Sequence, residues 1–230
     1  MEIGNSLIIF ANQMSAKIFI TGIGTNVGKT LVSKILCRVW SADYWKPMQS
    51  GDLHALDSQK VASIQDENFQ VIPEQFLLSQ PLSPHAAAEI DGIQLKVTDF
   101  KLPHTERNLI VEGAGGLLVP MNSDGDTILT LIQHLKIPVV LVSRHYLGSI
   151  NHTLLSVKAL ISQQIPIVGI IFVGEALPGT EEVISMHTNL PVLAKIPILE
   201  PFTDDTIKAY CETHGREIYL NLTHELERIR

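Results

Sequence analysis

A glycine-rich segment near the N-terminus has residue types and a spacing suited to binding phosphate groups. The segment at positions 22–30 reads GIGTNVGKT, after an apolar stretch and before an amphipathic one. Glycine lets backbone amides converge on an anion, and the first turn of a helix adds free N–H groups. Lys29 can then contact the β- and γ-phosphates of a nucleotide, and Thr30 can offer its hydroxyl to Mg²⁺. The segment therefore predicts a phosphate-binding loop.

The spacing of this loop differs by one residue from the pattern G-x-x-x-x-G-K-[ST]. That pattern requires glycine at position 23, where the chain has Ile23 between Gly22 and Gly24. The alternative is a strand, a turn and a helix whose glycines are incidental. We favour phosphate binding because the strand, the glycines, the lysine and the hydroxyl occur in the required order.

Two acidic residues are candidates to complete a Mg²⁺ site. Mg²⁺ prefers one or two carboxylates together with phosphate oxygens and water. Glu112 follows a buried apolar strand and precedes Gly113–Gly116, which allow other groups to come close. Asp57 is the second candidate. An isolated acid in a turn is the alternative for Glu112, and a helix N-cap is the alternative for Asp57.

Lys46 lies in the unusual stretch YWKPMQSG, positions 44–51. Pro47 keeps the backbone of Lys46 extended. We expect Ser50 and Gly51 to form a tight loop directly afterwards. A single lysine is usually a solvated surface residue, but this context indicates a fixed position.

The apolar pattern predicts the elements that must position these groups. Short runs rich in Val, Ile and Leu predict buried strands at Lys17–Thr21, Leu109–Val111, Pro138–Val142, Pro166–Phe172 and Pro191–Ile196. Helical stretches lie between them at Lys29–Trp40, Asp126–His134, Asn151–Gln164 and Thr180–Thr188. This alternation predicts a single-domain α/β fold, with a parallel sheet covered by helices on both faces and ligands at the carboxyl ends of the strands.

Residues 52–107 are harder to interpret. The stretch DSQKVASI, positions 57–64, is typical of a helix. The stretch FLLSQPLSPHAAAEIDG, positions 76–92, predicts a turn marked by Pro81 and Pro84 and then a helix. We expect the C-terminal helix at DDTIKAYCETHG, positions 204–215.

Composition narrows the class of protein. The chain has 230 residues, of which 45% are hydrophobic, enough to build one sizeable core. Its formal net charge of −7 argues against general binding to nucleic acid or anionic membranes. Its two cysteines and nine histidines show no disulfide framework and no zinc-ligand spacing.

The first fourteen residues hold one short apolar patch, without a basic segment or a cleavage site typical of a signal peptide. We expect residues 1–14 to be an N-terminal extension and residues 15–230 to be one domain. No apolar run approaches the roughly 20 residues of a membrane-spanning helix. We expect a soluble, cytoplasmic protein.

Seven motifs occur in an order that resembles the dethiobiotin synthetase family. These P-loop proteins share their fold with the partition and nitrogenase-iron-protein ATPases. The motifs are GIGTNVGKT at 22–30, KPMQSG at 46–51, Asp57 in LDSQKV, PLSPH at 81–85, VEGAGGLLVP at 111–120, LGSINHT at 147–153 and IPIL at 196–199. Each motif alone is a weak signal, but the series is specific and covers nearly the whole chain after Met14.

The resemblance implies a P-loop NTPase fold and an ATP-dependent ring closure. ATP, CO₂ (from bicarbonate) and 7,8-diaminopelargonate would give dethiobiotin, ADP and phosphate in biotin biosynthesis. The intermediates would be an N-carbamate and a carbamic-phosphoric anhydride. The resemblance also implies Mg²⁺ as cofactor and a homodimer with its active site at the interface. Nucleic acid and membranes are not expected partners.

The resemblance assigns roles to individual residues. The catalytic residues would be Lys46, Lys29 and Thr25. The metal ligands would be Thr30, Asp57 and Glu112. The diamine or its carbamate would contact Thr25, Ser50, Gly148, Ser149, Ile150 and Asn151. The nucleotide would contact Asn26, Val27, Gly28, Lys29, Thr30, Leu31, Asp57, Glu112, Gly113, Ala114, Gly115, Pro197, Ile198 and Leu199.

The chain departs from the family pattern at three places. Val173 stands where the family often has an asparagine that reads adenine, which leaves the base preference open. Asn26 stands at a position that is commonly acidic. The segment VWSADYWK, positions 39–46, is short, so a shortened second strand is expected.

Three other interpretations use the same phosphate loop. A ParA- or MinD-like switch ATPase would carry a second lysine five residues before Lys29, but that position is Gly24. A cobyrinate diamide synthase is usually far longer and has a glutaminase cysteine, for which this chain offers no candidate. The third is a nucleotide-binding domain without an assigned reaction.

Overall fold

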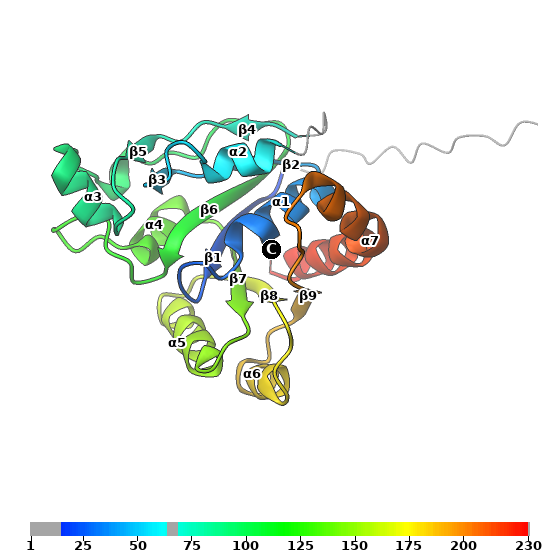
Figure 1. Cartoon of the computed structure of the whole chain (residues 1–230). Helices are drawn as coiled ribbons and strands as arrows, with labels where there is room; N and C mark the ends of the chain where they lie inside the picture. Colours follow the sequence, from blue (N-terminus) through cyan, green and yellow to red (C-terminus); the bar gives the residue numbers. More distant parts are fainter. Residues whose placement is uncertain (1–14, 64–68, 230) are drawn as a thin grey trace, which may run out of the picture.

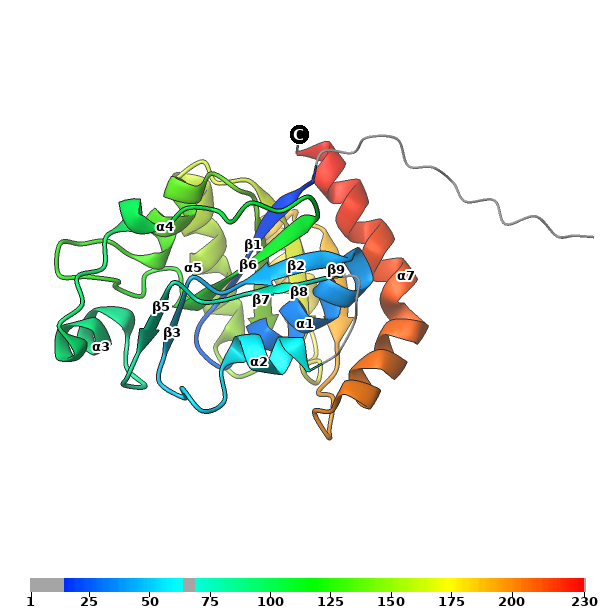
Figure 2. The same ribbon diagram turned by 90° about the horizontal axis from the view of Figure 1, so that it is seen from above.

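The computed structural model describes residues 15–63 and 69–229 (Figures 1 and 2). In these residues, seven parallel strands form one sheet in the order β4-β2-β6-β1-β7-β8-β9. Their bounds are β1 Lys17–Gly22, β2 Ala42–Trp45, β4 Val71–Ile72, β6 Asn108–Gly116, β7 Val139–Arg144, β8 Ile167–Val173 and β9 Val192–Ile196.

A second, two-stranded parallel sheet pairs β3, Met48–Ser50, with β5, Phe76–Leu78. The helices are α1 Lys29–Trp40, α2 Asp57–Ala62, α3 Pro84–Asp91, α4 Ile128–Leu135, α5 Ser149–Ser162, α6 Thr180–Thr188 and α7 Asp204–Arg228, with a 3₁₀ turn at Val97–Asp99.

Helices cover both faces of the main sheet, with α1 and α7 on one face and α4 and α5 on the other (Figures 1 and 2). Successive residues of a strand point to opposite faces. Ile18 and Ile20 therefore join the core under α1 and α7, whereas Phe19 joins the core on the α4 and α5 side. Two buried cores result, and both hold the strand ends in place. The predicted α/β architecture is confirmed.

The five predicted strands are all present, and their ends shift by a few residues. The largest shift is in β6, which continues through Gly113–Gly116 because those residues stay extended beside β1. Glycine is a poor strand signal, so the pattern ended too early. The second strand is short, with four residues in β2, as the short 39–46 segment indicated. The pairs of β4 with β2 and of β5 with β3 were not predicted.

The predicted end of the C-terminal helix at Gly215 is wrong. The helix α7 runs on to Arg228. Gly215 is buried against α1, and a Cβ atom there would lie 3.2 Å from Val39 Cγ2. The glycine therefore allows α7 to approach α1 closely and does not end the helix.

The α2 helix is shorter than its prediction, and the predicted last residue, 64, lies outside the described residues. The N-terminal extension at 1–14 also lies outside them, so that boundary stays a prediction. In the described part of the chain, no helix combines the length and the apolar character needed to cross a membrane.

Candidate active site

The phosphate-binding loop joins the end of β1 to the start of α1. Gly28 caps α1 with a left-handed backbone at φ 98°, and Asn26 also has a positive φ of 57°. Gly22 packs on Val27, because a Cβ atom at position 22 would lie 2.4 Å from Val27 Cγ2. Ile23 donates its backbone N–H to the Val142 carbonyl at 3.1 Å. The backbone of Ile23, the residue that departs from the standard spacing, is therefore held by a hydrogen bond to β7.

Arg144, the last residue of β7, supports the loop from the side. Its Nη1 donates to the Asn26 carbonyl at 2.9 Å. Arg144 belongs to none of the sequence motifs and was not predicted as a site residue. A charged residue at the carboxyl end of a buried strand was the available signal.

Gly28→Ala tests the backbone of the loop. We expect nucleotide affinity to fall about tenfold, because a left-handed backbone costs about 1–2 kcal/mol for a residue with a side chain. The new methyl group would also lie 3.0 Å from Val173 Cγ1. Fluorescent-nucleotide titration measures the change.

Gly92→Ala is the matched control, because Gly92 has φ 67° and open space around its would-be Cβ atom. It caps α3 and should leave nucleotide affinity unchanged. Normal affinity in Gly28→Ala would contradict the assigned loop geometry.

Lys29 lies inside the loop and is 7% exposed. Its Nζ donates to the Gly24 carbonyl at 2.9 Å. Burial, helped by the nearby Lys46 charge and opposed by Glu112 and Asp57, lowers the pKa of Lys29 to about 8. The ammonium form therefore still dominates at neutral pH.

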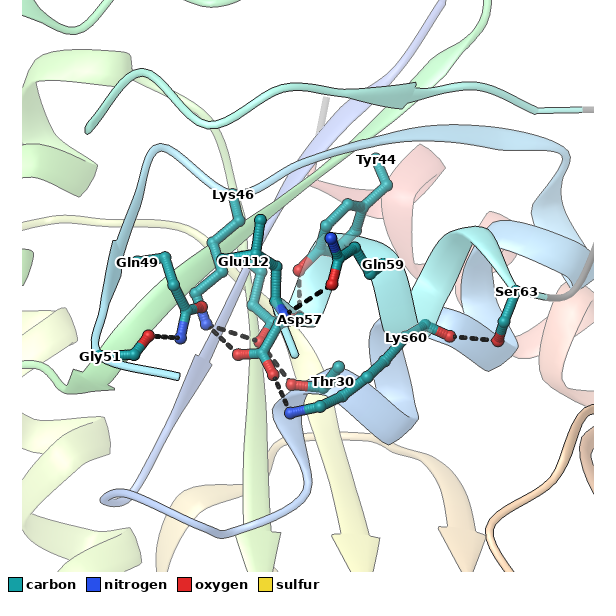
Figure 3. A network of polar contacts seen from close by, with 11 residues as sticks. Thr30, Tyr44, Lys46, Gln49, Gly51, Asp57, Gln59, Lys60, Ser63 and Glu112 are labelled. Atoms are coloured by element: carbon teal, nitrogen blue, oxygen red, sulfur yellow. Dashed lines mark hydrogen bonds and ion pairs between the residues drawn. The ribbon is translucent and has the colours of Figure 1, made fainter. Parts of the chain in front are cut away.

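A network of polar and charged side chains lies beside the loop, drawn from α1, α2, the residue after β2 and the middle of β6 (Figure 3). Thr30 Oγ1 donates to Glu112 Oε1 at 2.9 Å. Lys46 Nζ forms an ion pair with Asp57 Oδ2 and lies 3.6 Å from Glu112 Oε1. Lys60 Nζ binds the other Asp57 oxygen at 2.9 Å. The structure thus brings together the predicted residues Thr30, Lys46, Asp57 and Glu112.

Opposite charges in this network shift the pKa values of Lys46 and Asp57 toward their charged forms. Burial alone would lower the pKa of Lys46, but Glu112 and Asp57 outweigh it and hold that pKa above its usual value. Burial would raise the pKa of Asp57, but Lys46 and Lys60 outweigh it and hold that pKa below its usual value. Lys46 is therefore a fixed cation and Asp57 a fixed anion at neutral pH.

The oxygen donors of this network suit Mg²⁺. A hydroxyl and two carboxylates are hard ligands, and Mg²⁺ usually takes one or two carboxylates with phosphate oxygens and water. Within residues 15–63 and 69–229, no group of three or more His, Cys, Asp or Glu side chains could hold a metal ion by itself. The donors of Thr30, Asp57 and Glu112 fit a Mg²⁺ ion whose other ligands are phosphate oxygens and water. Asp57 is the first residue of α2 and not its N-cap.

The other predicted loop and turn residues surround this network. Thr25 and Asn26 are exposed on the loop, and Thr25 Oγ1 would lie 3.4 Å from a Cβ atom at Gly115. The Gly113–Gly116 segment thus lies against the loop. Ser50 is the last residue of β3, so the predicted tight loop begins one residue later, at Gly51. No described residue forms a hydrogen bond with the buried Ser50 hydroxyl.

Two predicted segments lie apart from the network. Gly148 caps α5 with φ 108°, and the buried Ser149 hydroxyl has no hydrogen-bond partner among the described residues. Pro197–Leu199 follow the end of β9. No hydrogen bond or ion pair of the described chain joins either segment to Lys46, and their assigned roles stay predictions.

Sequence reasoning also missed Tyr44 and Lys60. Tyr44 is fully buried, and its Oη donates to Glu112 Oε2 at 3.0 Å. Burial first, and then the Glu112 charge, raise the pKa of Tyr44 well above its usual value. Lys60 follows Asp57 by three residues on α2, a spacing that places two side chains on one helix face. That spacing was a usable signal, whereas Tyr44 looked like an ordinary core residue.

The fold and the loop geometry define a P-loop nucleotide-binding domain. The AAA domain family model matches residues 16–206. The septum site-determining protein MinD of Pyrococcus horikoshii, complexed with Mg-ADP, is similar with a TM-score of 0.59 and 15% identity over 94% of this chain and 97% of that one. A putative plasmid partition protein of Borrelia burgdorferi, bound to AMPPNP, is similar with a TM-score of 0.58 and 14% identity. The match covers 95% of this chain and 100% of that one. At these identities the likeness concerns the fold alone.

Curated relatives place the chain more narrowly. The ATP-dependent dethiobiotin synthetase of Christiangramia forsetii is 49% identical over 207 residues, which cover 89% of this chain and 99% of that one. The enzyme of the same name from Cytophaga hutchinsonii is 44% identical, and the match covers 84% of this chain and 94% of that one. The enzyme of the same name from Brucella ovis is 39% identical, and the match covers 84% of this chain and 92% of that one. The chain belongs to the ATP-dependent dethiobiotin synthetase family.

Proposed function

We propose that this protein is a cyclo-ligase that makes dethiobiotin in an ATP-dependent step of biotin biosynthesis. The observation that carries the proposal is the 49% identity to a dethiobiotin synthetase over 99% of that relative's length. The network around Lys46 supports it, because it supplies a buried cation next to a phosphate-binding loop.

The reaction closes a ureido ring on 7,8-diaminopelargonate. One amine attacks CO₂, forming a new N–C bond and releasing a proton. The resulting carbamate oxygen attacks the γ-phosphorus of ATP, and ADP leaves. The second amine attacks the carbamate carbon, loses its proton and expels phosphate. Such chemistry depends on positioning and charge neutralisation more than on covalent catalysis.

The residues of the network divide this work. Lys29 and the backbone amides of positions 26–30 hold the phosphates, and Thr25 assists at the reacting end. Lys46, kept charged by its two acidic neighbours, neutralises the carbamate and the moving phosphoryl group. Thr30, Asp57 and Glu112 would hold Mg²⁺. When bound, the ion offsets the negative charge that develops on the phosphates.

The nucleotide and the diamine extend away from this centre. We assign the nucleotide's other contacts to Leu31, to Gly113–Gly115 and to Pro197–Leu199. Val173 ends β8 and is buried against Gly28, so its side chain offers no hydrogen bond to a base. A side-chain hydrogen bond at this position therefore does not set the base preference. We place the reaction in the cytoplasm, where these substrates would be available.

The diamine site includes Thr25 and Ser50 at the reacting end. The helix N-terminus at Gly148–Asn151 suits the carboxylate tail of the diamine, because a helix N-terminus favours negative charge. The unpartnered Ser149 hydroxyl supports this assignment.

The same segment motivates a homodimer. Leu147 directly precedes it and is 99% exposed, so its side chain is available to a second copy. Leu147→Asp should shift the protein from dimer to monomer in light scattering, with circular dichroism unchanged. A native protein that is already a monomer at micromolar concentration would contradict this assembly.

The reaction itself is tested with ¹³C-labelled bicarbonate. The purified chain is incubated with ATP, Mg²⁺, labelled bicarbonate and 7,8-diaminopelargonate, and the product is identified by mass spectrometry. Dethiobiotin that carries one ¹³C atom is expected, and it should disappear when ATP or the diamine is omitted. Absence of this product from the complete mixture would contradict the proposed function.

A further inference from the structure

The two carboxylate oxygens of Glu112 have different partners. Oε1 accepts a hydrogen bond from Thr30 and faces Lys46. Oε2 accepts a hydrogen bond from Tyr44 Oη at 3.0 Å (Figure 3). Glu112 is 1% exposed, so no bulk water is at hand to replace a lost partner.

Strand register explains why Tyr44 reaches Glu112. The strands β2 and β6 are parallel neighbours, and Tyr44 pairs with Ile110. Glu112 lies two residues beyond Ile110, hence on the same face of the sheet. The long tyrosine side chain bridges this offset, and its ring is packed in the core under α1.

We propose that Tyr44 is a positioning residue, whose hydroxyl fixes the Glu112 carboxylate so that Oε1 stays turned toward Thr30 and the metal–nucleotide complex. This inference rests on the Mg²⁺ site in the proposed function. A carboxylate that is held at one oxygen presents the other in one orientation. Groups that orient a metal ligand in this way commonly change metal affinity about 10- to 100-fold when removed.

A purely structural role for Tyr44 is the competing explanation. Its ring fills the core, and its hydroxyl satisfies a buried acceptor, so any replacement could lower stability. Tyr44→Phe keeps the ring and removes only the hydroxyl. Tyr210→Phe is a matched control, because Tyr210 packs in the same core and its Oη donates to the Lys195 carbonyl at 3.1 Å, outside the charged network.

The experiment measures binding of Mn²⁺, used as the probe for Mg²⁺, to the complex of the full chain with ADP by electron paramagnetic resonance. We expect Tyr44→Phe to weaken Mn²⁺ binding about tenfold. Tyr210→Phe should stay within about twofold of the native protein. The Mg²⁺ concentration for half-maximal activity should rise in parallel in Tyr44→Phe, while the KM for the diamine stays unchanged.

Two outcomes overturn the inference in distinguishable ways. If Glu112→Gln loses Mn²⁺ binding but Tyr44→Phe binds it normally, the metal site stands and Tyr44 does not position Glu112. If Glu112→Gln itself binds Mn²⁺ normally, the metal site is misplaced and the inference fails with it. Melting curves check that each variant folds, and Tyr44→Met replaces Tyr44→Phe if that variant does not.

Discussion

Lys29→Ala is expected to abolish turnover and to weaken nucleotide binding. Lys29 provides a buried ammonium inside the loop, where it donates to the Gly24 carbonyl. A hydrogen bond to a charged group contributes about 1.5–3 kcal/mol, so affinity should fall about 10- to 100-fold. Titration with a fluorescent ATP analogue measures binding, and phosphate release measures turnover.

Lys158→Ala is the control for this change, because Lys158 is an exposed lysine on α5. It should leave both binding and turnover unchanged. Normal turnover in Lys29→Ala would show that the Gly22–Thr30 segment is not the phosphate-binding loop of this reaction.

Lys46→Gln is expected to separate binding from chemistry. Its ammonium contacts Asp57 and Glu112, not the loop backbone, so nucleotide affinity should stay within about threefold of native. Removing a preorganised charge from a buried site typically lowers kcat about 10²- to 10³-fold. Rapid-quench experiments in a single turnover isolate the chemical step.

Lys60→Gln is the matched control for Lys46→Gln. Lys60 also pairs with Asp57, but its side chain is 41% exposed and lies farther from Glu112 along the network. It should lower the rate less than tenfold. An equal loss in both variants would assign the effect to Asp57 alone, and an unchanged rate in Lys46→Gln would remove Lys46 from the mechanism.

The sequence predicted the centre of the site because that centre depends on simple rules. Thr30 lies in the first turn of the helix after β1, and Glu112 lies in a buried strand expected in the same parallel sheet. Carboxyl ends of parallel strands meet at one edge, so residues that end such strands come together. In the structure Thr30 Oγ1 donates a hydrogen bond to Glu112 Oε1, so these two residues do come together.

The surrounding contacts could not be predicted because they depend on register and on close packing. Tyr44 reaches Glu112 only through the pairing of β2 with β6, and a strand of four residues, ADYW, is too short to signal that register. Gly215 is of a residue type that often ends a helix, but here it allows close packing of α7 against Val39 of α1. The small β3–β5 sheet is made of three-residue strands, too short for a period of two to be recognised.

The most direct test of the account is phosphate release from ATP with Mg²⁺ and bicarbonate, measured with and without 7,8-diaminopelargonate. The account predicts release only when the diamine is present, with one dethiobiotin formed for each phosphate. Equal release without the diamine would contradict it and would favour a switch ATPase of the kind that shares this fold.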